Sequence, residues 1–400
     1  SAPPASFSLR SIAVTAFGPT LLFGIGEGAI LPVVPLTARE LGASQSQAAL
    51  IAALISIGSL VSNIPASLIT LHRGERWAIV AAAIWSIGAL ALCALTPHLA
   101  VFALGAFMVG MSQAVYSLAR QSYLTEAVPP EHRARALSTL GGSMRVGLFI
   151  GPFLAAGAIH QWGIGAAYAV GIVALIAAAA LGARMPDLEH HAAPDSGLAK
   201  PSIAGIVRSH RRLFLTLGLG ILLVAAVRAT RQAVLPLWAD HIGLAPSMAA
   251  LIYGLAGGVE MLVFYPAGQL MDRKGRRWVA VPSMIIMGVP LLLMPLTAGA
   301  VTLTLAAAAV GFGNGIGSGL VMTLGADHAP RHGRAHFLGV WRLMADLGST
   351  GGPALLALLT ATFSLGAGIA VTGLIAFAAA AQLAWWIPRA GGQPEGSSSA

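Results

Sequence analysis

Several ionisable side chains of this sequence lie inside apolar runs, where a charge is costly. Glu27, for example, is the one carboxylate in the stretch LLFGIGEGAILPVVP. Ionisable residues inside a membrane-spanning helix are rare, and by default they mark a functional site. We therefore predict that six of them form a network that carries charge or protons. These six are Glu27, Arg145, Arg228, Arg231, Glu260 and Asp346.

An internal repeat relates four of these residues. A shift of 201 residues places Glu27 on Arg228 and Arg145 on Asp346, so each half holds one acid and one base with the signs exchanged. Because an unpaired buried charge costs several kcal/mol, we expect each to have a partner. The pairs Glu27–Arg145 and Arg228–Asp346 are two options, and Glu27 with Arg228 is a third.

Arg231 lies one turn beyond Arg228 on the same helix face, and Glu260 could serve as its partner. Two interpretations of the charges are open. They are structural ion pairs that hold the helices together, or at least one carboxylate, Glu27 or Glu260, takes up and releases protons. A substrate that competes for an arginine would link its own binding to that proton exchange.

A stripe of polar side chains follows helical spacing within residues 99–124. Its members are three or four positions apart, which places them on one face of a helix. We predict a substrate cavity lined by this stripe, by its repeat positions and by one tyrosine: Gln113, Tyr116, Ser117, Arg120, Tyr253, Asn314 and Ser318. The alternative is hydrogen bonding between helices, which Ser and Asn commonly provide in membranes.

The composition is that of a membrane protein. Of 400 residues, 56% are hydrophobic and only 9% are charged, whereas a soluble domain has about 25% charged residues. A bilayer core takes roughly 20 apolar helical residues, and twelve runs meet that length. The spans are expected near residues 11–36, 46–70, 77–96, 99–124, 136–159, 164–184, 212–238, 247–271, 278–298, 300–325, 337–360 and 365–387.

The N-terminal segment and the cysteine content add two further expectations. The segment SAPPASFSLR lacks a signal-peptide cleavage pattern, so we interpret the first apolar run as a retained span. The single cysteine, Cys93, excludes an intramolecular disulfide.

The basic residues predict the orientation. With both termini in the cytoplasm, seventeen of the 23 Lys and Arg residues fall in inner loops and tails, and the outer loops hold only Arg39. Cytoplasmic loops of membrane proteins carry such an excess. The pI of about 10.7 therefore reflects membrane topology and does not indicate a nucleic-acid partner. We expect a multi-pass protein of the cytoplasmic membrane.

The same shift of 201 residues relates many other positions, such as Gly74 to Gly275 and Gly151 to Gly352. Parallel six-span repeats place a substrate site at their interface near the midplane. We predict a six-helix bundle over 11–185, a polar linker over 186–211, a second bundle over 212–388, and a disordered tail over 389–400.

The loop GQLMDRKGRR, which starts at Gly268, resembles the signature of the major facilitator superfamily between the second and third spans of a half. EAVPPEHRAR resembles the end of that family's fourth span, and GLFIGPFLAAG resembles the fifth-span signature of its exporters. The resemblance covers almost the whole chain. It implies an all-α fold of twelve transmembrane helices in two pseudo-symmetric six-helix bundles.

The charged residues of this loop also predict a gating loop whose charges change partners as the halves rock. Its residues here are Asp272, Arg273, Gly275, Arg276, Arg277, Glu126 and Asp327. The alternative is a plain positive loop with a tight glycine turn. Two features depart from the family: the intact loop lies in the second half, and the fourth-span arginine of proton-coupled exporters, expected near Ala106, is absent.

Gly147, Gly151 and Pro152 are interpreted as packing residues that let helix backbones approach closely and bend. The run GFGNGIGSG lies in an apolar span with no preceding strand, so we do not interpret it as a dinucleotide loop. We also predict no metal site, although His328, His332 and His336 are four residues apart, because Pro330 and Gly333 interrupt the helix.

We predict a secondary active transporter that moves a small organic molecule by alternating access, with proton-coupled efflux as the leading mode. Symport or exchange of an anionic substrate is the alternative, and a non-transporting sensor or scaffold is a third hypothesis. An enzyme is not expected, because no nucleophile–base pair is present. Protons, the substrate and membrane lipids are the expected partners, with no cofactor, and the chain is expected to be a monomer.

Overall fold

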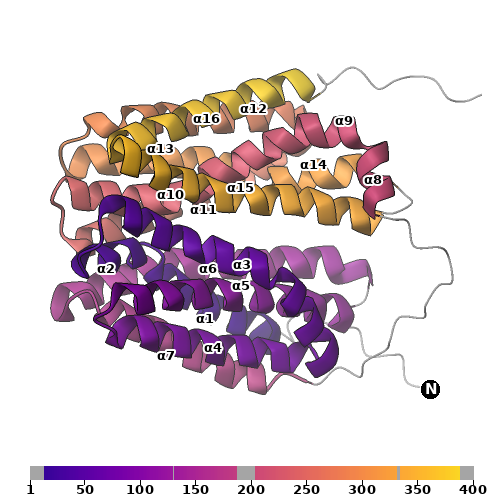
Figure 1. Ribbon diagram of the computed structural model, residues 1–400. Helices are drawn as coiled ribbons and strands as arrows, with labels where there is room; N and C mark the ends of the chain where they lie inside the picture. Colours follow the sequence, from indigo (N-terminus) through magenta and orange to yellow (C-terminus); the bar gives the residue numbers. More distant parts are fainter. Residues whose placement is uncertain (1–12, 129, 187–202, 331–333, 388–400) are drawn as a thin grey trace, which may run out of the picture. The chain divides into compact units, whose positions relative to one another are not determined.

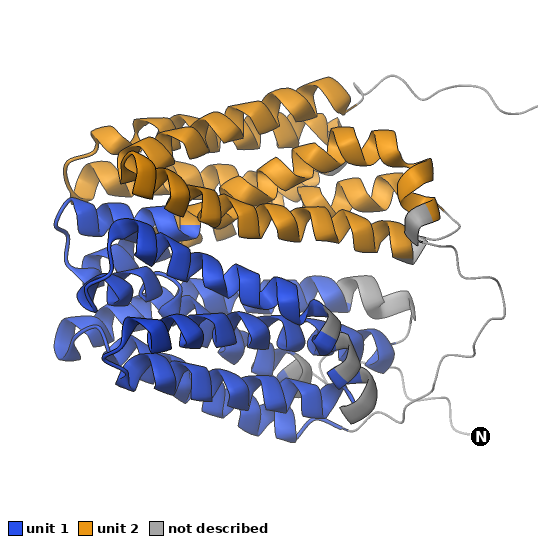
Figure 2. Cartoon of the chain, viewed as in Figure 1, with its two compact units in different colours: residues 1–195, 232–254 blue, residues 196–231, 255–400 orange. Residues whose placement is uncertain are grey.

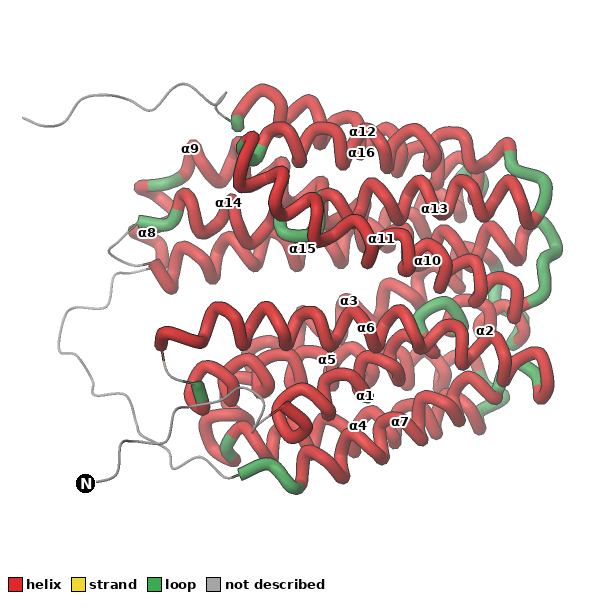
Figure 3. Tube along the Cα trace, turned by 180° about the vertical axis from the view of Figure 1, so that it is seen from behind, coloured by secondary structure: helices red, strands yellow, loops and turns green. Residues whose placement is uncertain are grey.

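The computed structural model describes residues 13–128, 130–186, 203–330 and 334–387 of this chain. Within these ranges every element is a helix, and short loops join the helices (Figure 3). Twelve helical segments are long and apolar enough to cross a membrane by length and composition. The predicted all-α membrane architecture with twelve spans is therefore confirmed.

The helices of the first half follow the chain in the order shown in Figure 1. They are α1 (Ala13–Ile30), α2 (Val34–Glu40), α3 (Gln45–Arg73), α4 (Glu75–Leu95), α5 (Leu99–Ala127), α6 (Pro130–Trp162) and α7 (Ala166–Ala183). The first candidate span, Phe17–Glu40, combines α1 and α2 across a short turn. Pro32 and Pro35 lie at this turn, and proline removes a backbone donor from a helix.

The second half begins with the short helices α8 (Ile203–Ser209) and α9 (Arg211–Leu213). A π-helical turn, η1 (Phe214–Gly218), then leads into the seventh span. The remaining elements are α10 (Leu219–His241), α11 (Pro246–Lys274), α12 (Arg277–Leu293), η2 (Met294–Leu296), α13 (Ala300–Ile316), α14 (Leu320–His328), α15 (Arg334–Thr362) and α16 (Leu365–Trp386).

The chain divides into two compact units (Figure 2). Unit 1 comprises Ser1–Asp195 with Gln232–Gly254, and unit 2 comprises Ser196–Arg231 with Leu255–Ala400. In unit 1, α1 packs mainly on α6 and α7, and α5 packs on α3 and α4. In unit 2, α12 packs mainly on α13 and α16. The predicted bundle limits at 11–185 and 212–388 remain a prediction.

The repeat that the sequence predicts is visible in the backbone. Gly42 and Gly243, 201 residues apart, both have positive φ, at 88° and 77°, and Gly74 and Gly275 have φ values of 79° and 91°. A left-handed residue closes the end of a helix, and glycine adopts it without a steric cost. The same helix-ending turn is therefore built at matching positions of the two halves.

Glycines also set the separation of α1 and α6. A Cβ atom added at Gly151 would lie 2.5 Å from the backbone nitrogen of Ala29 and 2.5 Å from the carbonyl oxygen of Ile25. The repeat position, Gly352 on α15, likewise faces the backbone of Ala226 on α10. The packing role predicted for Gly151 is confirmed by this geometry. The contact holds α1, which carries Glu27, against α6.

Replacing Gly151 by alanine is expected to destabilise the protein by about 1–3 kcal/mol, because the added methyl group overlaps the backbone of α1. Gly141→Ala on the same helix is the matched control, since a Cβ there meets nothing within 4 Å. Thermal unfolding of the purified protein measures both changes. Equal unfolding temperatures for the two variants would contradict the close contact.

Candidate functional site

Glu27 anchors a polar cluster in unit 1. Its side chain lies on α1 and is 9% exposed. The Gln113 amide on α5 hydrogen-bonds the carboxyl group, and Arg120, two turns further along α5, is the charge beside it. The Oε1 atom of Glu27 is buried and has no hydrogen-bond partner among the residues that the structure describes. The carboxyl group is thus partly satisfied inside an apolar layer.

Tyr116 closes one side of this cluster. It is 1% exposed, and its ring stacks on Phe23 with centroids 3.7 Å apart and an interplanar angle of 8°. Phe23 lies one turn before Glu27 on α1. The stack therefore joins α1 to α5 one helical turn from the carboxyl group. Three of the four residues of the predicted polar stripe, Gln113, Tyr116 and Arg120, belong to this cluster.

A second polar cluster lies in unit 2, around Arg228 of α10. Its Nε atom donates to Oδ1 of Asn314 at 2.6 Å, and its Nη1 atom donates to the carbonyl of Gly317 at 3.2 Å. Asn314 is only 2% exposed. The two acceptors lie where the tenth span breaks between α13 and α14. Irregular backbone at membrane depth needs such polar partners, and Arg228 supplies them.

Arg231 and Glu260 form the ion pair that the sequence predicts. Nη2 of Arg231 lies 2.6 Å from Oε2 of Glu260, and the side chains are 12% and 19% exposed. The Nε atom of Arg231 is buried and has no hydrogen-bond partner among the described residues. Gly315 lets α13 approach α11 at this point, because a Cβ there would lie 2.6 Å from the carbonyl oxygen of Glu260.

The two clusters occupy the same repeat positions. Glu27 and Gln113 of unit 1 correspond to Arg228 and Asn314 of unit 2 at a shift of 201 residues, and the contact is present in both units. The acid of unit 1 is replaced by a base in unit 2, and the neighbouring amide side chain hydrogen-bonds the charged group in both cases. An amide can do so because it offers both a donor and an acceptor.

The remaining midplane and cavity residues are placed as follows. Asp346 lies 3.9 Å from Arg342, four residues earlier on α15. The Oγ atom of Ser318 is buried near the break in the tenth span, with no described hydrogen-bond partner. Arg145, Ser117 and Tyr253 are partly buried on α6, α5 and α11. The suggested pairs Glu27–Arg145, Arg228–Asp346 and Glu27–Arg228 remain predictions.

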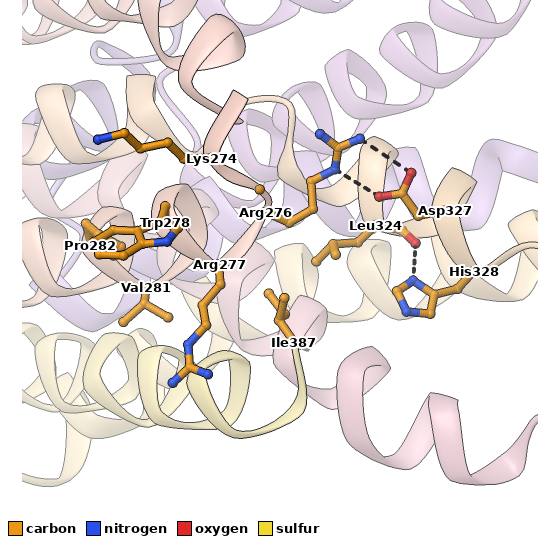
Figure 4. A pocket seen from close by; sticks show the side chains of 11 residues that line it. Lys274, Arg276, Arg277, Trp278, Val281, Pro282, Leu324, Asp327, His328 and Ile387 are labelled. Atoms are coloured by element: carbon orange, nitrogen blue, oxygen red, sulfur yellow. Dashed lines mark hydrogen bonds and ion pairs between the residues drawn. The ribbon is translucent and has the colours of Figure 1, made fainter. Parts of the chain in front are cut away.

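The predicted gating loop of unit 2 contains one ion pair. Arg276 donates from Nε to Oδ2 of Asp327 at 2.9 Å (Figure 4). Asp327 was expected as a partner of this loop, and the contact is present. Gly275 adopts its left-handed conformation in the same turn. The side chain of Asp272 lies outside the described residues.

The other members of this predicted set are accessible. Arg273 and Glu126 are exposed, and Arg277 is partly exposed. Whether these charges change partners during a cycle stays a prediction.

One ion pair was missed from the sequence. Nε of Arg39 lies 2.9 Å from Oδ2 of Asp240 within unit 1, and Gln45 hydrogen-bonds His241 beside it at 2.8 Å. Arg39 and Asp240 are 201 residues apart. The repeat could have predicted this pair, because it places opposite charges at matching positions here, as it does for Glu27 and Arg228.

No metal site emerges from the described residues, where no three His, Cys, Asp or Glu side chains come together. His328 bonds the carbonyl of Leu324 at 2.9 Å through Nδ1, and His332 lies outside the described ranges. The polar clusters of the two units are made of carboxyl, guanidinium and amide groups, which can bind ions or exchange protons.

Comparisons with known proteins agree with this architecture. The crystal structure of a D-xylose-proton symporter matches with a TM-score of 0.72 and 15% identity, over 95% of this chain and 98% of that one. A bacterial homologue of the human lysosomal transporter Spinster matches with a TM-score of 0.77 and 16% identity, over 96% and 97%. The xylose transporter XylE from E. coli matches with a TM-score of 0.73 and 14% identity, over 96% and 98%. At these identities the likeness shows the fold.

No curated protein sequence matches this chain. The family model for the Major Facilitator Superfamily matches residues 17–350 and, in a second alignment, 217–400. With twelve candidate spans, repeated halves and buried charge in each unit, the chain belongs to the Major Facilitator Superfamily and is a membrane transporter, not an enzyme.

Proposed function

We propose that this transporter couples the movement of a small organic molecule to protons, and that Glu27 carries the proton. It acts as a monomer in the cytoplasmic membrane with both termini in the cytoplasm. The observation that carries the proposal is the unit 1 cluster, where Glu27 is 9% exposed and one carboxyl oxygen has no described hydrogen-bond partner. Burying an unpaired charge costs several kcal/mol. When the transport cycle changes the exposure of Glu27 to water, its carboxyl group is therefore expected to gain or lose a proton.

The two carboxylates that the sequence singles out are proposed to have different roles. Glu260 is held by Arg231 at 2.6 Å, which suits a fixed clamp between α10 and α11. Glu27 is hydrogen-bonded by an uncharged amide, with Arg120 as the nearby charge. An uncharged partner accommodates both the neutral and the ionised carboxyl group, as a proton carrier requires. Efflux by antiport is the direction that the fifth-span signature favours.

In proteoliposomes, an imposed pH gradient is expected to drive transport by the wild-type protein and not by Glu27→Gln, because the amide cannot exchange a proton. The substrate is first identified by a thermal-shift screen of anionic, cationic and neutral organic molecules. Substrate binding by Glu27→Gln should persist. Glu40→Gln is the matched control, since Glu40 ends the same span but is exposed. Gradient-driven transport that survives in Glu27→Gln would rule out the proton role.

A double-mutant cycle tests the clamp. Removing one partner of a buried ion pair typically costs about 3–5 kcal/mol, because the other charge remains buried. Each single variant, Arg231→Gln or Glu260→Gln, should therefore unfold at a lower temperature than the double variant, in which no buried charge is left without its partner. If the losses simply add, the residues do not stabilise each other and the clamp assignment is wrong.

Symport or exchange of an anion is the second candidate function. It is supported by the two arginines of α10, since Nε of Arg231 is buried without a described hydrogen-bond partner and Arg228 lies at the break of the tenth span. Guanidinium groups bind carboxylates and phosphates in a bidentate manner. The similar D-xylose-proton symporter shows that proton symport occurs on this fold.

The thermal-shift screen separates the two candidates. If the substrate is anionic, a protecting carboxylate or phosphate ester should bind Arg228→Gln about tenfold or more weakly, because a charge-assisted hydrogen bond contributes about 1.5–3 kcal/mol. A neutral or cationic hit should protect this variant and the wild type equally. Anionic hits that protect both proteins to the same extent would contradict the anion site.

A further inference from the structure

The tenth span is broken in the middle of unit 2. α13 ends at Ile316 and α14 begins at Leu320, and residues 317–319 between them form turns instead of helix. In unit 1, α5 is one continuous helix through the matching positions, 116–118. Because the α-helical hydrogen bonds are interrupted at the break, the two parts of the tenth span can bend relative to each other.

Glycine contacts hold α13, the first part of this span, against its neighbours. A Cβ atom added at Gly311 would overlap the carbonyl group of Ala256 on α11. One added at Gly313 would lie 2.9 Å from the backbone nitrogen of Met287 on α12. Small residues that allow such backbone contact stabilise helix packing in membranes. α13 is therefore fixed to both α11 and α12.

α14, the second part, has a different environment. Among the described helices its main contact is with α15, where Nε1 of Trp341 donates to the carbonyl of Val321 at 2.8 Å. A pocket of about 730 Å³ lies between α14 and the start of α12. Leu324 and Asp327 line it from α14, and Trp278 lies across from them on α12 (Figure 4). An element with few packed neighbours and a cavity beside it changes position at low cost.

Two arginines hold the ends of α14 in position. At the break, Arg228 of α10 donates from Nη1 to the carbonyl of Gly317 at 3.2 Å and from Nε to Asn314 at 2.6 Å. At the other end, beside the pocket, Arg276 donates to Asp327 at 2.9 Å. Both are side-chain contacts, which can break and form again while α13 stays packed.

We propose that α14 is a gate that swings about residues 317–319, and that Arg228 and the Arg276–Asp327 pair lock it. The pocket beside α12 gives α14 the space to move. Discontinuous helices of transporters lie beside their substrate and ion sites. A negative group that binds the guanidinium of Arg228 would compete with the Gly317 carbonyl and release the gate. The proposal rests on the alternating access proposed above, but not on protons.

Distance measurements between two spin labels on the full chain in liposomes test the motion. Ala326→Cys places one label on the exposed face of α14, and Ile285→Cys places the other on α12, in a Cys93→Ala background. Double electron–electron resonance should resolve two distances for this pair. Arg228→Gln should raise the population of the displaced position about tenfold, which is the effect of losing one charge-assisted hydrogen bond. Arg276→Gln should shift the population in the same direction.

Gly319→Ala should narrow the distribution to one distance, because alanine restricts the backbone at the break. A Cβ at this position would meet most closely the flexible end of Met271, at 3.3 Å, so the variant is expected to fold. Gly339→Ala on α15 is the matched control, since a Cβ there meets nothing within 4 Å. It should keep both distances.

A label pair on α13 and α12, Leu305→Cys with Ile285→Cys, is the fixed reference and should give one distance in every variant. A single, unchanged α14–α12 distance in the wild type and in both arginine variants would overturn the gate. So would a reference pair that moves together with the α14 pair. If Arg228→Gln does not fold, Arg276→Gln alone decides. These distances do not depend on gradient-driven transport, so a failure of the proton role is distinguishable from a failure of the gate.

Discussion

A charge inside an apolar layer needs a partner, and this requirement governs the placement of the functional residues. Charged side chains are rare within membrane spans, because transferring a charge from water into the bilayer costs free energy. Here each buried charge that carries the account has a polar neighbour on another helix: Glu27 has Gln113, Arg228 has Asn314, and Arg231 has Glu260. The sites therefore lie where α1 meets α5, where α10 meets α13, and where α10 meets α11.

Close helix packing makes those contacts possible. Gly151 brings the backbone of α6 against Ile25 and Ala29 of α1, and Gly315 brings α13 against Glu260 of α11. In membranes there is no hydrophobic force between helices, so small residues that allow backbone contact stabilise the bundle. The glycines that pack the helices within each unit thus also fix the positions of the charged side chains. A larger residue at these points would separate both the helices and the polar pairs.

Sign exchange between repeats gives the two halves one framework with different chemistry. Glu27 and Arg228 occupy matching positions, and so do Arg39 and Asp240, which contact each other directly. Repeated helices keep the same neighbours, so an amide faces this position in both units. Because an amide has both a donor and an acceptor, it can bond either an acid or a base. The cluster around Glu27 suits proton exchange, and the two arginines of α10 suit binding of negative charge. This division explains why the proposed proton carrier lies in unit 1 and the alternative anion site in unit 2.

Much of the fold could be predicted from the sequence, because span length, loop charge and the repeat each leave a strong signal. The pair Arg231–Glu260 and the contact of Asp327 with the gating loop were also suggested by the sequence, from the positions of opposite charges along the chain. The placement of Gln113 and Arg120 beside Glu27 was not, since rise per residue gives depth along a helix but not its rotation relative to other helices. Packing brings Arg120 of α5 beside Glu27, and the pair Glu27–Arg145 stays a prediction. The break at Gly317 was missed because glycines also occur in continuous spans.

Infrared difference spectroscopy of the protein in liposomes tests the central claim, that Glu27 exchanges a proton, most directly. Spectra recorded between acidic and alkaline pH report the carbonyl stretch of any protonated carboxyl group that titrates. The account predicts a titrating band in the wild type that is lost in Glu27→Gln and retained in Glu260→Gln. A band that persists unchanged in Glu27→Gln, or that disappears in Glu260→Gln alone, would contradict it.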